Sequence, residues 1–216
     1  PPAPTHARPR RMTGHTPTLE DPTEFVQSPK GCLTSQREVG VPSPNFADAL
    51  HSALREDPDV ILVGEMRDLE TIGIAVTAAE MGILVMGTLH TNGAAQTVDR
   101  IINSFPADKQ AHIRTMISTS LRGVVSQQLL PTTHKPGRAA ALEIMINTPA
   151  VSNLIRQGKL DQLETAIQSG GSIGMKSMDA ALMDLVEKGW VSGQEAYLQA
   201  NNKHKFEKVR DMDSAH

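Results

Sequence analysis

Two acids and a histidine occupy positions that predict chemistry at one edge of a sheet. Glu65 follows the apolar, β-branched run 59–63, and His90 follows the apolar run 83–89. Runs of this length and composition are typical of strands that are buried on both faces of a parallel sheet. The carboxyl ends of parallel strands meet at one edge of the sheet, so we expect Glu65 and His90 to lie on the same edge. In open α/β sheets, this is the edge at which ligands bind.

An acid at that edge is suited to handling Mg²⁺ and the attacking water of a nucleotide. The alternative is a core strand that ends in a solvated glutamate, and residues 57–68 by themselves leave both interpretations open. Glu20 and Asp21 form a second acidic pair, for which a turn starting at Asp21-Pro22 is the alternative. His90 has an alternative too, since a lone histidine after a strand is commonly capped or solvated.

The elements that would position these residues alternate between strand and helix. Asn45 and Asp68 are predicted N-caps of two helices, which carry apolar residues at helical spacing. The predicted stripes are Phe46, Ala49, Leu50, Ala53 and Leu54 in the first helix, and Ile72, Val76 and Ala79 in the second. A third helix contains Val98, Ile101 and Ile102. This alternation predicts a doubly wound α/β sheet.

The remaining segments are shorter. Residues 16–22 are expected to be extended, with short strands at 24–26 and 32–36. A helical stripe around Ile113 is followed by strands at 124–130 and 139–146, which are joined by a turn. Short helices are predicted at 151–156, 160–167, 178–187 and 194–200. The charged tail from Lys203 is expected to fray.

Composition narrows the class of protein. The net charge of −3 and the six aromatic residues (four Phe, one Trp, one Tyr) argue against nucleic-acid binding. The lone Cys32 excludes a disulfide framework, and the eight scattered histidines argue against a zinc site. The apolar stretch 81–89 is far shorter than the roughly 20 residues of a membrane span, and no secretory signal is visible. We expect a soluble cytoplasmic protein.

Several separated segments resemble the ATPases of type II and type IV secretion systems. Leu19-Glu20-Asp21-Pro22 resembles their Asp box, residues 59–67 their Walker B element with glutamate in place of aspartate, and residues 87–91 their His box. Residues 36–40, 55–59 and 105–106 also stand where that family has them. The resemblance covers Thr13 to Phe206.

Within that family the chain is most similar to the PilT-type ATPases of type IV pilus retraction. Extension and secretion ATPases carry a four-cysteine zinc module where this chain has only residues 132–137, so no zinc is expected. Residues 150–157 resemble the retraction signature Ala-Ile-Arg-Asn-Leu-Ile-Arg-Glu, with Ser152 in place of arginine and Gln157 in place of glutamate. Residues 170–177 also fit that group.

The resemblance implies an α/β fold: a partial RecA-like P-loop ATPase core at 13–147 and a mainly helical C-terminal region at 148–216. Residues 1–12 are expected to be an irregular Pro/Arg-rich start that is not native to the domain. No segment matches G-x-x-x-x-G-K-[ST], the P-loop whose N–H groups cradle phosphates. Residues 174–177 (Gly-Met-Lys-Ser) come close to this motif. They lie between late helices rather than after a strand, so we reject them as a P-loop. We therefore expect a chain that begins after the P-loop strand and helix, as a fragment, a truncated gene product or a mis-joined frame.

The resemblance and the chemistry of phosphoryl transfer together give the predicted site residues for ATP and Mg²⁺. Glu65 is expected to hold Mg²⁺ through water and to orient the attacking water. Glu20 is expected to be the general base or the acid that positions the water. His90 is expected to donate a hydrogen bond to the γ-phosphate or to relay the nucleotide state to a neighbouring subunit. The other predicted nucleotide-binding residues are Asp21, Gly64, Arg67, Thr88, Arg37 and Arg55. Solvated surface positions are the alternative for at least one of the arginines.

The implied function is the C-terminal motor portion of a hexameric ATPase that powers pilus retraction and twitching motility. Its implied partners are the other copies of a homo-hexamer, an inner-membrane pilus platform protein and other pilus ATPases, at the cytoplasmic base of the pilus machine. Without a P-loop, the chain alone is expected neither to bind ATP tightly nor to hydrolyse it. The alternatives are a non-catalytic fragment that joins hexamers of an intact relative, or an accessory paralogue.

Overall fold

The computed structural model describes residues 14–20, 33–38 and 45–213. These residues form two compact units, which are described separately below. The first unit contains the described residues up to His90 together with Asn103–Leu121. The second contains Thr91–Ile102 and the described residues from Arg122 onward.

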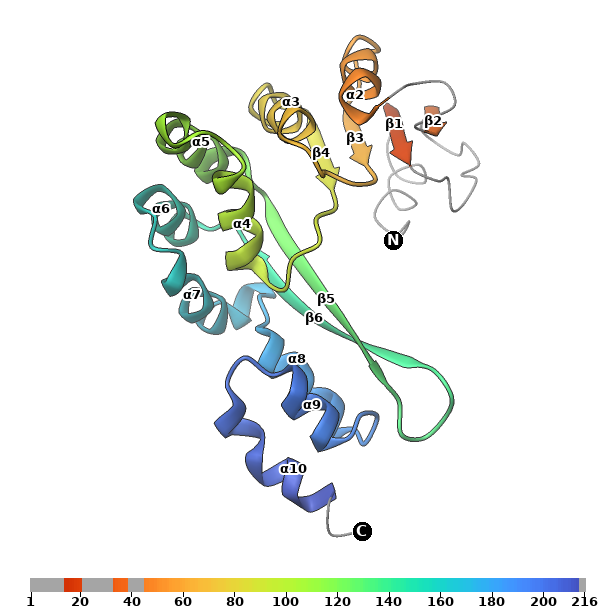
Figure 1. The fold of residues 1–216 in the computed structure, drawn as a ribbon, viewed down its shortest axis with the longest axis vertical. Coiled ribbons are helices and arrows are strands. Elements are labelled where there is room, and N and C mark those ends of the chain that lie inside the picture. The colour runs from red at the N-terminus through yellow and green to blue at the C-terminus, as the bar shows by residue number, and fades with distance from the viewer. Residues whose placement is uncertain (1–13, 21–32, 39–44, 214–216) are drawn as a thin grey trace. The chain divides into compact units, whose positions relative to one another are not determined.

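The first unit is built on a four-stranded parallel sheet with the strand order β2-β1-β3-β4. Its strands are β1 (His15–Glu20), β2 (Leu33–Glu38), β3 (Val60–Val63) and β4 (Leu84–Gly87). The predicted parallel sheet is confirmed, and Figure 1 shows the strands running side by side. β1 is an inner strand between β2 and β3, although the sequence indicated only an extended segment there. The strand predicted at 24–26 lies outside the described residues.

Helices α2 (Phe46–Leu54), α3 (Leu69–Glu80) and α5 (Ala107–Ser120) complete the first unit. The predicted N-caps are confirmed, since the side chains of Asn45 and Asp68 each accept a backbone N–H at 2.8 Å. These caps satisfy donors that the first turn leaves unpaired. The buried face of α3 differs from the predicted stripe: Ala75 and Ala78 are buried, whereas Val76 and Ala79 are half-buried.

The core of the first unit joins the sheet to α2 and α3. Leu19 of β1 and Ile61 of β3 are completely buried, and Leu50 of α2 packs in the same cluster. The other members of this cluster are Phe46, Ala49, Ala53, Val63 and Ala75. Burial of these side chains fixes the strands in the register that brings their carboxyl ends together.

The second unit begins with α4 (Ala94–Asn103) and a long antiparallel hairpin of β5 (Gly123–Pro131) and β6 (Arg138–Ile146) (Figure 1). The two strands predicted at 124–130 and 139–146 are therefore confirmed, as a separate two-stranded sheet. The following α-helices are α6 (Pro149–Gln157), α7 (Leu163–Ser169), α8 (Met178–Glu187), α9 (Gly193–Gln199) and α10 (Glu207–Asp213). Short 3₁₀ turns, η1 (Leu160–Gln162), η2 (Gly171–Ile173) and η3 (Lys203–Phe206), lie between them.

The hairpin is hydrogen-bonded to the chain on both sides of α8. Ile144 and Lys176 exchange backbone hydrogen bonds of 2.8 and 3.0 Å just before the helix begins. After the helix ends, the Thr133 N–H donates to the Trp190 carbonyl oxygen at 3.0 Å, and the Thr133 hydroxyl donates to that of Gly189 at 2.7 Å. The hairpin and α8 thus form one closed structural element.

The charged tail is ordered through α10, so the predicted fraying from Lys203 is wrong. Phe206 is 0 % exposed and belongs to the core formed by α8, α9 and the hairpin. The Lys203 ammonium donates to the carbonyl oxygens of Tyr197 and Leu198, both at 2.6 Å, at the C-terminal end of α9. The pattern was missed because a single aromatic residue anchors an otherwise charged stretch.

In the ranges 14–20, 33–38 and 45–213, no helix combines the length and the apolar character needed to cross a bilayer. The domain boundaries predicted at residues 12 and 147 stay predictions. Residues 1–12 lie outside the described ranges.

Candidate functional site

The register of the parallel sheet brings the ends of β1, β3 and β4 together. Leu19 pairs with Val63, which in turn pairs with Gly87. Just beyond the strands, the Gly64 N–H donates to the Leu19 carbonyl oxygen at 2.7 Å. Glu20 and Glu65 therefore leave neighbouring strands at the same edge, where the sequence predicted them.

The Glu65 carboxylate at this edge contacts two basic side chains. Its Oε1 lies 3.0 Å from Nε2 of His90, and its Oε2 lies 2.5 Å from a terminal guanidinium nitrogen of Arg67. The Glu65 side chain is only 18 % exposed, whereas those of His90 and Arg67 are 81 % and 68 % exposed. The structure thus brings together three residues that the sequence singled out.

These contacts favour the ionised form of Glu65. The hydrogen bond from Arg67 lowers the pKa of the carboxyl group, and the charge of Arg67 and the contact with His90 lower it further against a smaller opposing effect of burial. Glu65 is therefore an acceptor-only carboxylate at neutral pH.

We expect the Glu65 carboxyl to titrate below its ordinary value of 4.5, and Arg67→Ala to raise the midpoint toward that value. Because the folded-state pKa is lowered, the stabilisation from Glu65 is present above the unfolded pKa and is lost as the pH falls through the folded-state pKa. Carboxyl ¹³C NMR titration of both chains tests this. Equal midpoints in the two chains would show that the Arg67 contact is not made in solution.

The donor set fits a Mg²⁺ ion held through water. Mg²⁺ prefers hard oxygen ligands, usually retains several waters and is commonly bound by one or two carboxylates together with substrate phosphates. Glu65 supplies such an oxygen. In the described part of the chain, no group of three or more His, Cys, Asp or Glu side chains is arranged as an all-protein metal site.

Glu20 at the end of β1 is oriented by neutral partners. Its Oε1 accepts the Thr18 hydroxyl at 2.9 Å and the Gln36 amide at 3.1 Å. Thr18 and Gln36 face each other in the β1–β2 register, and Thr18 is completely buried. The sequence did not single out these two orienting residues individually. The alternation along residues 16–20 is the signal that places Thr18 on the same side of the strand as Glu20.

Gly64 permits the close approach of β1 and β3 at this edge. A Cβ atom at Gly64 would lie 2.8 Å from the Leu19 carbonyl oxygen and 3.3 Å from the Cα of Glu20. Both atoms belong to backbone, so a side chain here would push the strand ends apart. Gly64 is therefore required for packing, and a role in nucleotide binding stays a prediction.

Gly64→Ala is expected to lower the free energy of unfolding by about 1–3 kcal/mol, as overpacking does in protein cores. Gly171→Ala is the matched control, because a Cβ there meets nothing within 4 Å. Urea denaturation followed by circular dichroism measures both. A loss no larger in Gly64→Ala than in the control would contradict the close approach.

Of the other predicted nucleotide-binding residues, Thr88 lies at the edge that carries Glu65, whereas Arg37 contacts α2. The Thr88 hydroxyl donates to the Gly64 carbonyl oxygen, so Thr88 joins the segments that follow β3 and β4. Arg37 donates to the Ser52 hydroxyl at 2.9 Å and forms an ion pair with Glu56, near the C-terminal end of α2.

Arg55 is the C-cap residue of α2 and precedes β3. Among the described residues, no hydrogen bond or ion pair joins Arg37 or Arg55 to Glu65. Asp21 lies outside the described residues.

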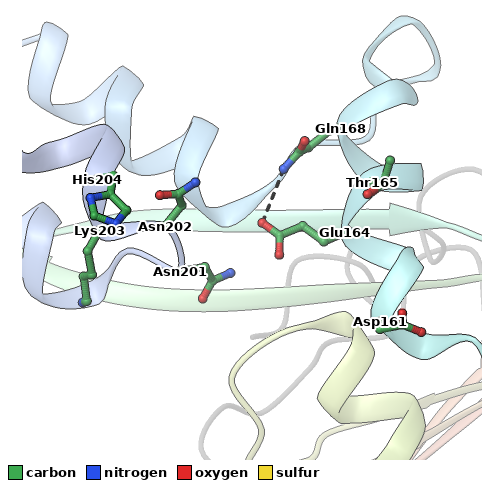
Figure 2. A pocket seen from close by; sticks show the side chains of 8 residues that line it. All are labelled: Asp161, Glu164, Thr165, Gln168, Asn201, Asn202, Lys203 and His204. Atoms are coloured by element: carbon green, nitrogen blue, oxygen red, sulfur yellow. Dashed lines mark hydrogen bonds between the residues drawn. The ribbon is translucent and has the colours of Figure 1, made fainter.

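A polar pocket of the second unit contains none of the predicted site residues (Figure 2). Its volume is about 580 Å³, and a hydrogen bond joins Gln168 to Glu164 on one wall. The lining residues are Asp161, Glu164, Thr165, Gln168, Asn201, Asn202, Lys203 and His204. Most of these side chains are exposed, and the ammonium of Lys203 caps α9.

Comparison with known proteins identifies the family. Residues 11–196 match the family described as type II/IV secretion system protein. The chain belongs to this family. The resemblance noted from the Asp, Walker B and His boxes is thereby confirmed, and so is the RecA-like secretion-ATPase fold.

Two relatives are each 54 % identical to this chain. One is the type IV pilus retraction ATPase PilT of Pseudomonas aeruginosa, matched over 89 % of this chain and 56 % of the relative. The other is a twitching motility protein of Neisseria gonorrhoeae, matched over 87 % of this chain and 50 % of the relative.

The chain is also similar to a solved structure, the pilus retraction motor PilT with bound ADP. The TM-score is 0.87 at 42 % identity, over 94 % of this chain and 57 % of that one. The chain therefore spans about half the length of the relatives it matches.

Proposed function

We propose that this chain forms the carboxylate and imidazole side of the ATP site in a motor that drives type IV pilus retraction. The observation that carries the proposal is the Glu65 carboxylate, held between His90 and Arg67 at the carboxyl edge of a parallel sheet. The 54 % identity to a protein named as a pilus retraction ATPase supports retraction, rather than extension, as the direction of the motor.

In this proposal each residue acts through its charge or its hydrogen bonds. Glu65 holds Mg²⁺ through water, and Mg²⁺ when bound neutralises phosphate charge. Glu20, oriented by Thr18 and Gln36, positions or deprotonates the attacking water. His90 is largely exposed and reaches Glu65, so it can report the presence of the γ-phosphate.

The predicted binding residues take supporting roles. Arg67 contributes a positive charge near the phosphates, and Asp21 contributes a second carboxylate beside Glu20. Gly64 and Thr88 shape the edge on which the nucleotide lies. Arg37 and Arg55 fit contacts with a neighbouring subunit better than contacts with nucleotide in the same chain, because the structure keeps both near the end of α2. The bound ADP in the related motor supports a nucleotide as ligand.

The assembly belongs to the proposal as well. We propose a homo-hexamer at the cytoplasmic base of the pilus machine, acting on an inner-membrane platform protein and alongside other pilus ATPases. Family membership supports these partners. The 216-residue chain has no match to the phosphate-cradling P-loop motif, so we propose that by itself it does not turn over ATP.

A chimera tests the proposal. The matching segment of P. aeruginosa PilT is replaced by this chain, and phosphate release is measured with malachite green. We expect ATPase activity and restored twitching in a strain that lacks its own PilT, and no turnover by the chain alone. A folded chimera without ATPase activity would overturn the proposed function.

A further inference from the structure

Glu143 on β6 is a buried acid to which no role has yet been assigned. It is 4 % exposed. Among the residues that the structure describes, its carboxylate forms no ion pair with a basic side chain. Burial of a carboxylate without compensating partners is costly. The partners of Glu143 are backbone N–H groups at the start of two different helices.

Each carboxylate oxygen of Glu143 accepts one of these N–H groups. Oε1 accepts from Ala94, the first residue of α4, at 2.7 Å, and Oε2 accepts from Met178, the first residue of α8, at 3.2 Å. A helix N-terminus carries roughly half a positive charge, so the two together roughly balance one carboxylate. The two helix ends thus take the place of a basic side chain as partners of Glu143.

The α4 end depends on this external cap. Gly93 accepts the first helical hydrogen bond, from the Thr97 N–H at 3.0 Å, and has no side chain that could cap the helix. Its φ is +121°, and a Cβ there would lie 3.4 Å from Oε1 of Glu143. Both features favour glycine at this position, and the capping acceptor then has to come from another segment.

The capped turn also fixes the residues that follow His90. The Thr97 hydroxyl donates to the Gly93 carbonyl oxygen at 2.8 Å and lies 2.7 Å from the Thr91 hydroxyl. Only Thr91, Asn92 and Gly93 separate His90 from α4. At the α8 end, the paired Ile144 and Lys176 hold β6 beside the start of the helix.

We infer that Glu143 is a positioning residue that ties the start of α4 to the start of α8 within the second unit. This inference does not rest on the proposed function. Through α4, Glu143 fixes the turn 91–93 that precedes this helix. Through α8, it couples that turn to the C-terminal helices.

The test uses the 216-residue chain without nucleotide, so its outcome is independent of ATPase activity. Glutamine has one acceptor oxygen where glutamate has two, so in Glu143→Gln an amide NH₂ group faces one of the two N–H donors. We expect the exchange rate of the Ala94 or Met178 amide to rise about ten- to hundredfold, as expected for loss of a charge-assisted hydrogen bond. We also expect the amide signals of Thr91 and Asn92 to shift, because the turn 91–93 precedes the start of α4 that Glu143 caps.

Glu187→Gln is the matched control, because Glu187 is exposed at the far end of α8. If Glu143→Gln does not fold, Glu143→Asp replaces it, since the shorter acid keeps its charge but does not span both helix ends. Unchanged amide exchange would overturn the tie between the helices. Faster exchange with unchanged signals of Thr91 and Asn92 would overturn the positioning of the turn 91–93. Failure of the chimera to hydrolyse ATP would count against the proposed function alone.

Discussion

Glu65→Gln should reduce phosphate release by the PilT chimera by at least about a hundredfold, the scale associated with loss of a general acid–base group or a preorganised electrostatic contact. Glutamine keeps the shape of the side chain but removes the charge that draws Mg²⁺ and its water. It also weakens the pairing with Arg67 and His90 at 2.5 and 3.0 Å. The effect should fall on kcat more than on KM, because the lost interaction acts in the transition state.

Glu80→Gln makes the same chemical change at the exposed end of α3 and should leave the rate within about twofold. Circular dichroism of both chimeras checks that the fold is retained. If Glu65→Gln were as active as Glu80→Gln, the assignment of Glu65 to the nucleotide site would be wrong, even in a chimera that drives twitching.

Phe206→Ala should lower the free energy of unfolding of the second unit by about 3–5 kcal/mol, the range for truncating a fully buried phenylalanine. Phe206 is 0 % exposed and packs in a cluster with Leu182 and Ala196. Removing its ring leaves a cavity between the last helices and the hairpin. The expected loss is a large fraction of the stability of a typical domain.

Trp190 is the single tryptophan of the chain and lies in the second unit, so its fluorescence in urea reports the unfolding of that unit. Leu198→Ala is the control, since Leu198 is 54 % exposed and its truncation should cost less than about 1 kcal/mol. Equal urea midpoints for the two variants would mean that the tail does not pack as described.

The sequence was most informative where a local rule decides the structure. The caps at Asn45 and Asp68, the buried strand before Glu65 and the hairpin at 123–146 each follow from residue type and short spacing. The family motifs then located Glu20, Glu65 and His90 on one edge, and the register of the parallel strands agrees with that location.

Long-range partners were not predictable in this way. Nothing near Glu143 in the sequence indicates that its oxygens meet the first residues of α4 and α8, which lie 49 and 35 positions away. The pairing of Arg37 with Glu56 likewise depends on how α2 packs against the sheet. Hydrophobic periodicity predicts which face of a helix or strand is buried, but it does not predict which polar group of another segment that face will contact.

The double attachment of the β5–β6 hairpin to α8 has a mechanical consequence. A helix joined to a ribbon only at one end can peel away from the other, but here both ends of α8 are tied, through Lys176 on one side and Thr133 on the other. Separation that starts at either end must first break the attachment at that end, so we expect the hairpin and α8 to move together as one rigid element.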